Sequence, residues 1–176
     1  MRKIWTGQLS ASPLGPIWVA VSELGLVSVD YGKLQGDFAR TSFQGPQFEI
    51  EQTALPLQQI EEYLLGKRQA FTLPIDWSGL TSFQRQILEA TCEIPYGGTT
   101  TYKALAMQAG KPGAARAVGR VEALNPMPLV IPCHRVVGTD GKLHGYAGPR
   151  GVETKAWLLK LEQQAQSASG WIKLPR

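Results

Sequence analysis

Cysteine and histidine are scarce in this sequence, and long apolar runs are absent. Its 176 residues include two cysteines, Cys92 and Cys133, and two histidines, His134 and His144. Structural zinc sites use four such ligands in close pairs, and no CxxC or HxxxH pair occurs, so we expect no metal site. We also expect both thiols to be reduced. With no run of about 18 apolar residues to span a membrane and no apolar segment typical of a secretory signal, we expect a cytoplasmic protein.

Charge is unevenly distributed along the chain, although the formal net charge is only +4. Residues 1–76 carry six Lys/Arg and eight Asp/Glu, whereas residues 77–165 carry ten and six. A basic half beside a slightly acidic half favours a polyanionic partner for the basic half. A solvated surface without a partner would show the same asymmetry, so charge alone leaves nucleic-acid binding open.

The first third of the chain is patterned as strands. Short β-rich runs separated by Gly and Pro predict a meander of strands at 4–11, 17–23 and 26–32. Apolar residues at helical spacing then predict a helix over 53–65, with Gly66 as its stop. Residues 71–79 are predicted to be extended and to contain a domain boundary.

Beyond that boundary the pattern changes to helices and turns. Thr81 or Ser82 can cap a helix over 83–94, and the threonines at 99–101 can cap a second helix that ends near Gly110. A third helix over 114–124 follows after a Gly/Pro turn, so this pair is a candidate helix-turn-helix. A last helix is predicted over 152–164.

Together these patterns predict an α/β protein of two domains. Residues 1–76 should form a small N-terminal domain with an antiparallel sheet. Residues 77–165 should form a mainly helical domain with the helix-turn-helix, and residues 166–176 a tail. We expect the N-terminal domain to give structural support only.

Cys133 is the best candidate for a reactive group. The apolar run 129–131 predicts a short strand that ends at Pro132 and Cys133, where side chains are often used for chemistry. The adjacent imidazole of His134 can take the thiol proton, directly or through water, and Glu162 could orient that imidazole. On these residues alone, Cys133 could equally be a small buried apolar residue. Cys92 lies within a predicted helix and is interpreted as structural.

Several segments resemble one known family. The run IPCHRVVGTDG closely resembles the active-site signature of the O6-alkylguanine-DNA alkyltransferases, also called methylated-DNA–protein-cysteine methyltransferases. SFQRQILEATCEIPYGGTTTY, ARAVG and NPMPLVIPCHRV resemble the segments that precede this signature, including the recognition helix and the hinge. SPLGPIWVAVSELGLVSV resembles the N-terminal strands, so the likeness extends from about residue 10 to residue 163.

The resemblance implies both a fold and an activity. The N-terminal domain should be ribonuclease-H-like. The protein should be a single-turnover enzyme that repairs DNA by irreversible transfer of an alkyl group from O6-alkylguanine to Cys133, after base flipping from the minor groove. O4-alkylthymine is a second expected substrate. The resemblance implies no cofactor. The expected partner is double-stranded DNA that contains O6-alkylguanine. We expect the protein to be a monomer in solution, and whether several molecules bind DNA cooperatively is left open.

Residue roles are carried over where the motifs match. The resemblance implies that Cys133 is the acceptor, that His134 activates it through water, and that Glu162 polarises His134. Asn125 would tie the hinge, and Tyr102 would help to rotate the phosphate and donate to N3 of guanine. The residues implied to contact DNA or the flipped base are Arg116, Ala115, Ala117, Gly119, Tyr102, Pro128, Val136, Tyr146 and Ala147.

Two other functions compete with alkyl transfer. A lesion-binding protein without transfer activity would resemble this fold but replace the acceptor cysteine, and Cys133 is present. A thiol hydrolase using Cys133 and His134 would leave the slim, arginine-bearing helix 114–124 without a role. One departure from the family pattern is the loop between Tyr146 and Trp157, which is about two residues longer than usual.

Overall fold

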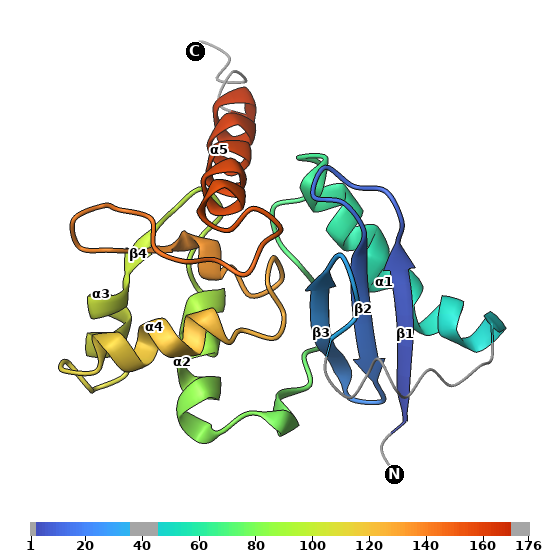
Figure 1. Cartoon of the computed structure of the whole chain (residues 1–176), viewed down its shortest axis with the longest axis horizontal. Helices are drawn as coiled ribbons and strands as arrows, with labels where there is room; N and C mark the ends of the chain where they lie inside the picture. Colours follow the sequence, from blue (N-terminus) through green and yellow to red (C-terminus); the bar gives the residue numbers. More distant parts are fainter. Residues whose placement is uncertain (1–2, 36–45, 170–176) are drawn as a thin grey trace, which may run out of the picture.

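The computed structural model describes the backbone of residues 3–35 and 46–169 and the side chains of residues 3–35 and 51–165. A sheet with one covering helix forms one side of the molecule, and shorter helices form the other (Figure 1). This arrangement confirms the predicted combination of an antiparallel N-terminal sheet and a mainly helical C-terminal half. No helix in the described part of the chain combines the length and the apolarity that crossing a membrane requires.

The N-terminal sheet has three antiparallel strands in the order β1-β2-β3. They are β1 (Ile4–Leu9), β2 (Ile17–Ser22) and β3 (Gly25–Tyr31), as the short β-rich runs predicted. Residues 74–76, which lead from the N-terminal half to the C-terminal half, run along β3. Leu26 N–H donates to Pro74 O, and Asp76 N–H donates to Leu26 O. Gly25 permits this approach, since a Cβ there would lie 2.3 Å from Pro74 O.

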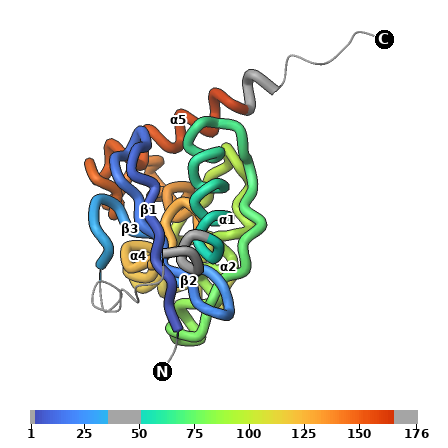
Figure 2. The backbone as a smooth tube through the Cα atoms, turned by 90° about the vertical axis from the view of Figure 1, so that its right-hand side faces the viewer, coloured from blue at the N-terminus to red at the C-terminus, as the bar shows by residue number. Residues whose placement is uncertain are grey.

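Helix α1 (Pro46–Leu64) packs beside the sheet, against β1 and β2 (Figure 2). The predicted start at residue 53 is wrong, because the helix begins seven residues earlier, at Pro46. Proline is favourable in a first helical turn, and apolar spacing does not detect that signal. The predicted stop is confirmed: Gly66 has a φ of +71°, and its N–H donates to Tyr63 O.

Capping residues fix the helices of the C-terminal half. Thr81 and Gln84 form a capping box at the start of α2 (Ser82–Cys92), and the Thr101 side chain caps α3 (Tyr102–Gln108). Helix α4 (Ala115–Ala123) follows after the turn that contains Gly110 and Pro112, which confirms the helix-turn-helix. Helix α5 (Val152–Ser169) starts where predicted and runs five residues further.

Short elements join the helices. A 3-10 turn, η2 (Trp77–Gly79), interrupts the segment predicted to be extended up to residue 79. Two-residue strands, β4 (Thr100–Thr101) and β5 (Val136–Val137), form a parallel pair that the sequence did not indicate. A second 3-10 turn, η3 (Cys133–Arg135), precedes β5.

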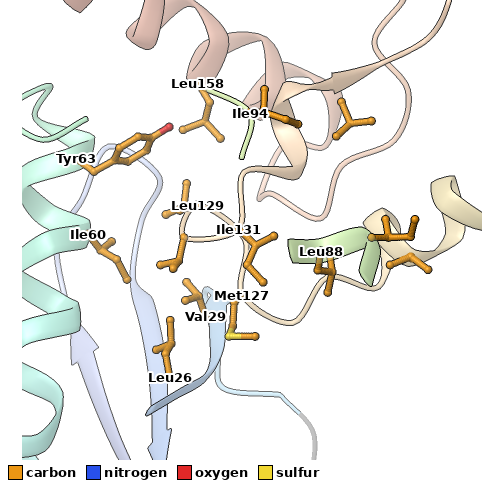
Figure 3. Packing of buried hydrophobic residues seen from close by; sticks show 14 of the residues in the cluster. Leu26, Val29, Ile60, Tyr63, Leu88, Ile94, Met127, Leu129, Ile131 and Leu158 are labelled. Carbon is orange, nitrogen blue, oxygen red and sulfur yellow. The ribbon is translucent and has the colours of Figure 1, made fainter. Parts of the chain in front are cut away.

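One apolar core is shared by both halves. Met127, Leu129 and Ile131 are buried in one cluster with side chains of α1, β3 and α2 (Figure 3). Val29 N–H of β3 also donates to Pro126 O at 2.9 Å. The segment leading to Cys133 is therefore packed directly on the N-terminal sheet. Because the core is continuous, the boundary between residues 76 and 77 remains a prediction.

Candidate functional site

Cys133 lies in the 3-10 turn η3, not at the end of a strand. The predicted strand over 129–131 is wrong: Pro128 and Ile131 form only an isolated bridge, and Leu129 has a φ of +74°. A regular β-strand does not contain that left-handed conformation, which L-residues rarely adopt. Cys133 is 5 % exposed, and its N–H donates to Ile131 O at 2.8 Å.

Asn125 holds this irregular segment in place. Its Nδ2 donates to Ile131 O at 2.9 Å, and its Oδ1 accepts from Met127 N at 3.0 Å. Asn125 is buried at the end of α4, so its amide replaces the ladder that a strand would provide. The turn that carries Cys133 is therefore coupled to the helix-turn-helix through one side chain.

His134 is completely buried and points one ring nitrogen at a carboxylate. Its Nε2 lies 2.8 Å from Glu162 Oε1 and 3.1 Å from the Tyr63 hydroxyl. Burial lowers the pKa of His134, although the Glu162 carboxylate opposes that shift. A neutral imidazole with its proton on Nε2 leaves Nδ1 as an acceptor. Nδ1 is buried and has no hydrogen-bond partner among the described residues.

Glu162 accepts hydrogen bonds from several elements at once. Tyr63 of α1 donates at 2.6 Å, Gly97 N–H at 2.8 Å, and Arg135 from Nη2 at 2.9 Å. Burial would raise the pKa of Glu162, but hydrogen bonds from His134, Arg135 and Tyr63 outweigh it and hold the pKa at about 2. The carboxylate is therefore charged throughout the neutral range.

The Cys133 thiol is protonated in the resting protein. Burial raises its pKa to about 12, and the charge of Glu122 adds to that effect. A hydrogen bond with Asn125 and the charge of Lys155 act in the opposite direction. Because the reactive form of cysteine is the thiolate, this thiol needs a base before it can react.

Lys155 lies beside the Cys133 turn and is almost fully buried. Its Nζ donates to Val136 O at 2.7 Å, to Tyr102 OH at 3.3 Å and to His144 O at 3.3 Å. The pairing of β4 with β5 brings Tyr102, the first residue of α3, close to Val136. Burial lowers the pKa of Lys155, and the charges of Cys133 and Glu122 raise it.

Most of the other predicted residues line two hollows next to α4. A cavity of about 670 Å³ is lined by part of α4 and by the loop 138–145, and it includes Tyr102, Ala115, Arg116 and Gly119. A hollow of about 220 Å³ includes Asn125, Pro128 and Ala147. Ala123 lines both hollows, so they lie next to each other. Ala117 is exposed on α4 and does not line either one.

Tyr146 lies between the two halves of the molecule. Its hydroxyl is 2.9 Å from the Tyr31 hydroxyl of β3, and its ring meets the His134 ring edge-on at 6.4 Å. Cys92, interpreted as structural, is exposed with a free thiol. Among the described residues, no three His, Cys, Asp or Glu side chains gather as a metal site would require.

Four residues of this site were missed by the sequence reasoning, namely Tyr63, Arg135, Lys155 and Glu122. Arg135 stands inside the PCHRV motif, and Lys155 shares helical spacing with Leu158 and Glu162 on the buried face of α5, so both left a signal. Tyr63 left none beyond its place in an apolar helical stripe. Its hydroxyl belongs to the hydrogen-bond network of His134, so the N-terminal half contributes a side chain to this site.

Family comparison matches both halves of the chain. A family model described as "6-O-methylguanine DNA methyltransferase, DNA binding domain" matches residues 82–164. A model described as "6-O-methylguanine DNA methyltransferase, ribonuclease-like domain" matches residues 7–77, which confirms the expected character of the N-terminal half.

Similar proteins carry names from one family. A methylated-DNA–protein-cysteine methyltransferase of Methanosarcina barkeri is 44% identical over 154 residues, which cover 86% of this chain and 93% of that protein. An inducible protein of the same name from Bacillus subtilis is 43% identical over 74% of this chain and 73% of its own length. The crystal structure of Mycobacterium tuberculosis OGT in complex with DNA is 33% identical, with a TM-score of 0.78 over 91% of this chain and 93% of that one.

Proposed function

The chain belongs to the 6-O-methylguanine DNA methyltransferase family, and we propose that it repairs DNA by moving a methyl group from O6-methylguanine to Cys133. The observation that carries this proposal is a buried imidazole, next in sequence to the buried thiol of Cys133, with Nε2 held by a charged carboxylate and Nδ1 without a partner among the described residues. That arrangement fits a cysteine nucleophile activated by an oriented base.

The proposed activation passes through Nδ1 of His134. The thiol proton of Cys133 moves, through one water molecule, to this nitrogen, and the imidazolium that forms is stabilised by Glu162. The Cys133 thiolate then attacks the alkyl carbon. A sulfur–carbon bond forms while the bond from carbon to O6 breaks, and the electron pair leaves with guanine. A thioether is not hydrolysed under ordinary conditions, so each molecule acts once and irreversibly, without a cofactor.

The damaged base must leave the duplex to reach Cys133. A flipped base costs a few kcal/mol of stacking and pairing, and less when it is damaged. We assign Arg116, exposed at the start of α4, to the gap that the flipped base leaves in the stack. The small side chains of Ala115, Ala117 and Gly119 let α4 approach the minor groove closely, where readout depends little on sequence.

Donors and acceptors for the flipped guanine surround the Cys133 turn. We propose that the carbonyls of Cys133 and Val136 accept from its amino group, although Lys155 already uses one lone pair of Val136 O. Ala147 N–H would donate to O6, and Tyr102 to N3, so that the charge on departing guanine is stabilised. Pro128 and Tyr146 would form the walls of the pocket.

The rest of the proposal concerns scope and assembly. O4-alkylthymine presents an alkyl group on a similar exocyclic oxygen, so we include it as a second substrate. We propose a cytoplasmic monomer that binds double-stranded DNA. The non-catalytic alternative, a protein that binds alkylguanine without transfer, would leave the His134–Glu162 pair without a task, since nothing would need a base.

Mass spectrometry tests the transfer directly. The protein is mixed with a short duplex that contains one O6-methylguanine, then digested, and its peptides are weighed. We expect a single added methyl group on the Cys133 peptide, saturating at one per molecule, and none on the Cys92 peptide. Cys133→Ser is the matched control and should gain no mass. Binding of the duplex without any added mass would favour the lesion-binding alternative.

A further inference from the structure

Glu122 is a buried carboxyl group that the mechanism above does not use. It lies on α4, is 6% exposed, and its Oε1 is 2.7 Å from the Thr91 hydroxyl of α2. Its Oε2 is buried and has no hydrogen-bond partner among the described residues. An ionised carboxylate in this position would leave a charged oxygen unsatisfied, which is costly in a protein interior.

The hydroxyl of Thr91 provides a second indication that Glu122 is neutral. This hydroxyl has one proton but two acceptors within reach, Glu122 Oε1 at 2.7 Å and Ile87 O at 2.9 Å. If Glu122 carries a proton, it donates to Thr91 Oγ1 while Thr91 donates to Ile87 O, and Oε2 is left as an uncharged carbonyl oxygen, which costs less to bury than a charged one. If Glu122 is ionised, Thr91 must turn its proton away from Ile87 O.

Titratable groups from four neighbouring elements interact with Glu122. They are Cys92 of α2, Tyr102 of α3, Lys155 of α5 and Cys133 of η3. Burial raises the pKa of Glu122 to about 7, against the opposing effects of Thr91 and Lys155. Ionised Glu122 in turn raises the pKa of Cys133, and burial is the only larger cause of that shift.

We propose that Glu122 is a positioning residue that acts through Cys133: it stays protonated while the thiolate forms, and its ionisation suppresses the reactivity of the thiol. The inference rests on the proposed function for its biological meaning, because only a reactive Cys133 gives Glu122 something to control. Raising the pH therefore has two opposing effects in this protein. It keeps His134 neutral and so able to take the thiol proton, and it ionises Glu122, which opposes thiolate formation at Cys133.

Removing the charge of Glu122 while keeping the shape of its side chain isolates the second effect. Glu122→Gln keeps an oxygen that can accept from Thr91 but can never be ionised. We expect the rate ratio of this variant to the wild type to be about 1 at pH 5.5, where both side chains are neutral. The ratio should rise through neutral pH to about tenfold at pH 9, the change in thiolate population for one pKa unit.

Two readouts separate this inference from the proposed function. One is single-turnover methyl transfer from a duplex with one O6-methylguanine. The other is reaction of Cys133 with methyl methanethiosulfonate, a small thiolate reagent that needs no DNA, followed by mass spectrometry of the Cys133 peptide. Glu153→Gln is the matched control, since Glu153 is exposed in the first turn of α5, and its ratio should stay near 1 at every pH.

A second variant keeps the inference testable if Glu122→Gln does not fold. Glu122→Met replaces the carboxyl group with an unbranched, uncharged side chain of similar length that needs no partner for Oε2. Because this side chain is never ionised, the variant should react faster than the wild type near pH 8 and equally fast at pH 5.5.

The possible results have distinct meanings. A pH-dependent rate ratio with the thiol reagent supports the role of Glu122. A ratio that stays near 1 at all pH values, or that lies below 1 throughout, overturns it. If Cys133 reacts normally with methyl methanethiosulfonate but no methyl group is transferred from DNA, the proposed function is overturned instead. The role of Glu122 is then decided by the pH dependence of the rate ratio measured with this reagent.

Discussion

At the scale of single residues, the proposed chemistry depends most on the charge of Glu162. Glu162→Gln removes the group that stabilises the His134 imidazolium, so we expect single-turnover methyl transfer to slow by about 10²–10⁴-fold, the usual contribution of a general base. The pH profile should change as well. Neutral His134, whose pKa lies below its ordinary value of 6.5, makes the wild-type rate nearly flat between pH 7.5 and 9.5 apart from the effect of Glu122. When the imidazolium is no longer stabilised, hydroxide has to remove the thiol proton, and the rate should rise about tenfold per pH unit toward the Cys133 pKa of about 12.

The same variant also leaves the buried Arg135 without a counter-charge, which costs about 3–5 kcal/mol of stability. The rate is therefore measured on protein that circular dichroism shows to be folded. Tyr63→Phe is the control, because it removes one donor to Glu162 and keeps the ion pair with Arg135. An unchanged pH profile in Glu162→Gln would reduce Glu162 to a structural partner of Arg135.

Sequence reasoning found those site residues that lie in one continuous motif or match a family pattern. His134 and Glu162 were predicted and share one hydrogen-bond network, and the predicted Cys133 is the buried residue next to His134 in the chain. Tyr63 was not predicted, because it reaches the site from a distant helix whose register no local pattern reveals. Glu122 was not either, although it lies on the buried face of the predicted helix 114–124. A buried charge at an apolar helical position, as at Lys155, is the one local signal that would have helped.

At the scale of elements, α4 contains Gly119, and glycine is a weak helix former. Gly119 also lies on the face of α4 that lines the cavity of about 670 Å³. Gly119→Ala should fit, since the nearest side-chain atoms to an added Cβ are carbons of the Tyr102 ring, at 3.8 and 3.9 Å. Replacing a helical glycine should raise the unfolding free energy by about 0.5–1 kcal/mol. Because Gly119 lines the cavity with Arg116, the added methyl group should nevertheless slow repair of duplex DNA.

Transfer from the free base O6-methylguanine should not change in Gly119→Ala, since this reaction needs no contact between α4 and DNA. Gly113→Ala makes the same chemical change in the turn before α4, where nothing lies within 4 Å, and should leave both rates unchanged. Equal slowing of duplex and free base in Gly119→Ala would show that the methyl group disturbs Tyr102 and not the approach to DNA.

Elements with a local chemical signal were predicted well, and those held by distant contacts were not. The caps at Thr81 and Thr101 and the stop at Gly66 are readable because each depends on neighbours within a few residues. The strand predicted at 129–131 failed because apolar residues there are buried by packing against β3 and α2. Its backbone is set by the amide of Asn125, and apolar spacing carries no information about that bond.

At the scale of the whole molecule, the site is built where the two halves meet. Tyr63 of α1 reaches Glu162 of α5, and Tyr31 of β3 meets Tyr146. The carbonyl of Pro126, two residues before Pro128, accepts from Val29 of the sheet. A change of volume at Cys133 therefore acts on a segment to which both halves are attached.

Methylation of Cys133 is expected to destabilise the entire protein for this reason. The thiol is 5 % exposed, so an added methyl group has to displace its neighbours, and overpacking of this kind costs typically about 1–3 kcal/mol. For a chain of this length, each kcal/mol lowers the Tm by about 2–4 °C. Calorimetry of the free and methylated forms should therefore show a Tm that is roughly 2–12 °C lower after reaction. Cys133→Ser, treated with the same duplex, should show no such decrease. Equal Tm values for the free and methylated protein would mean that the Cys133 turn has room for the product, and that the contacts of Asn125 and Pro126 do not transmit the reaction to the N-terminal sheet.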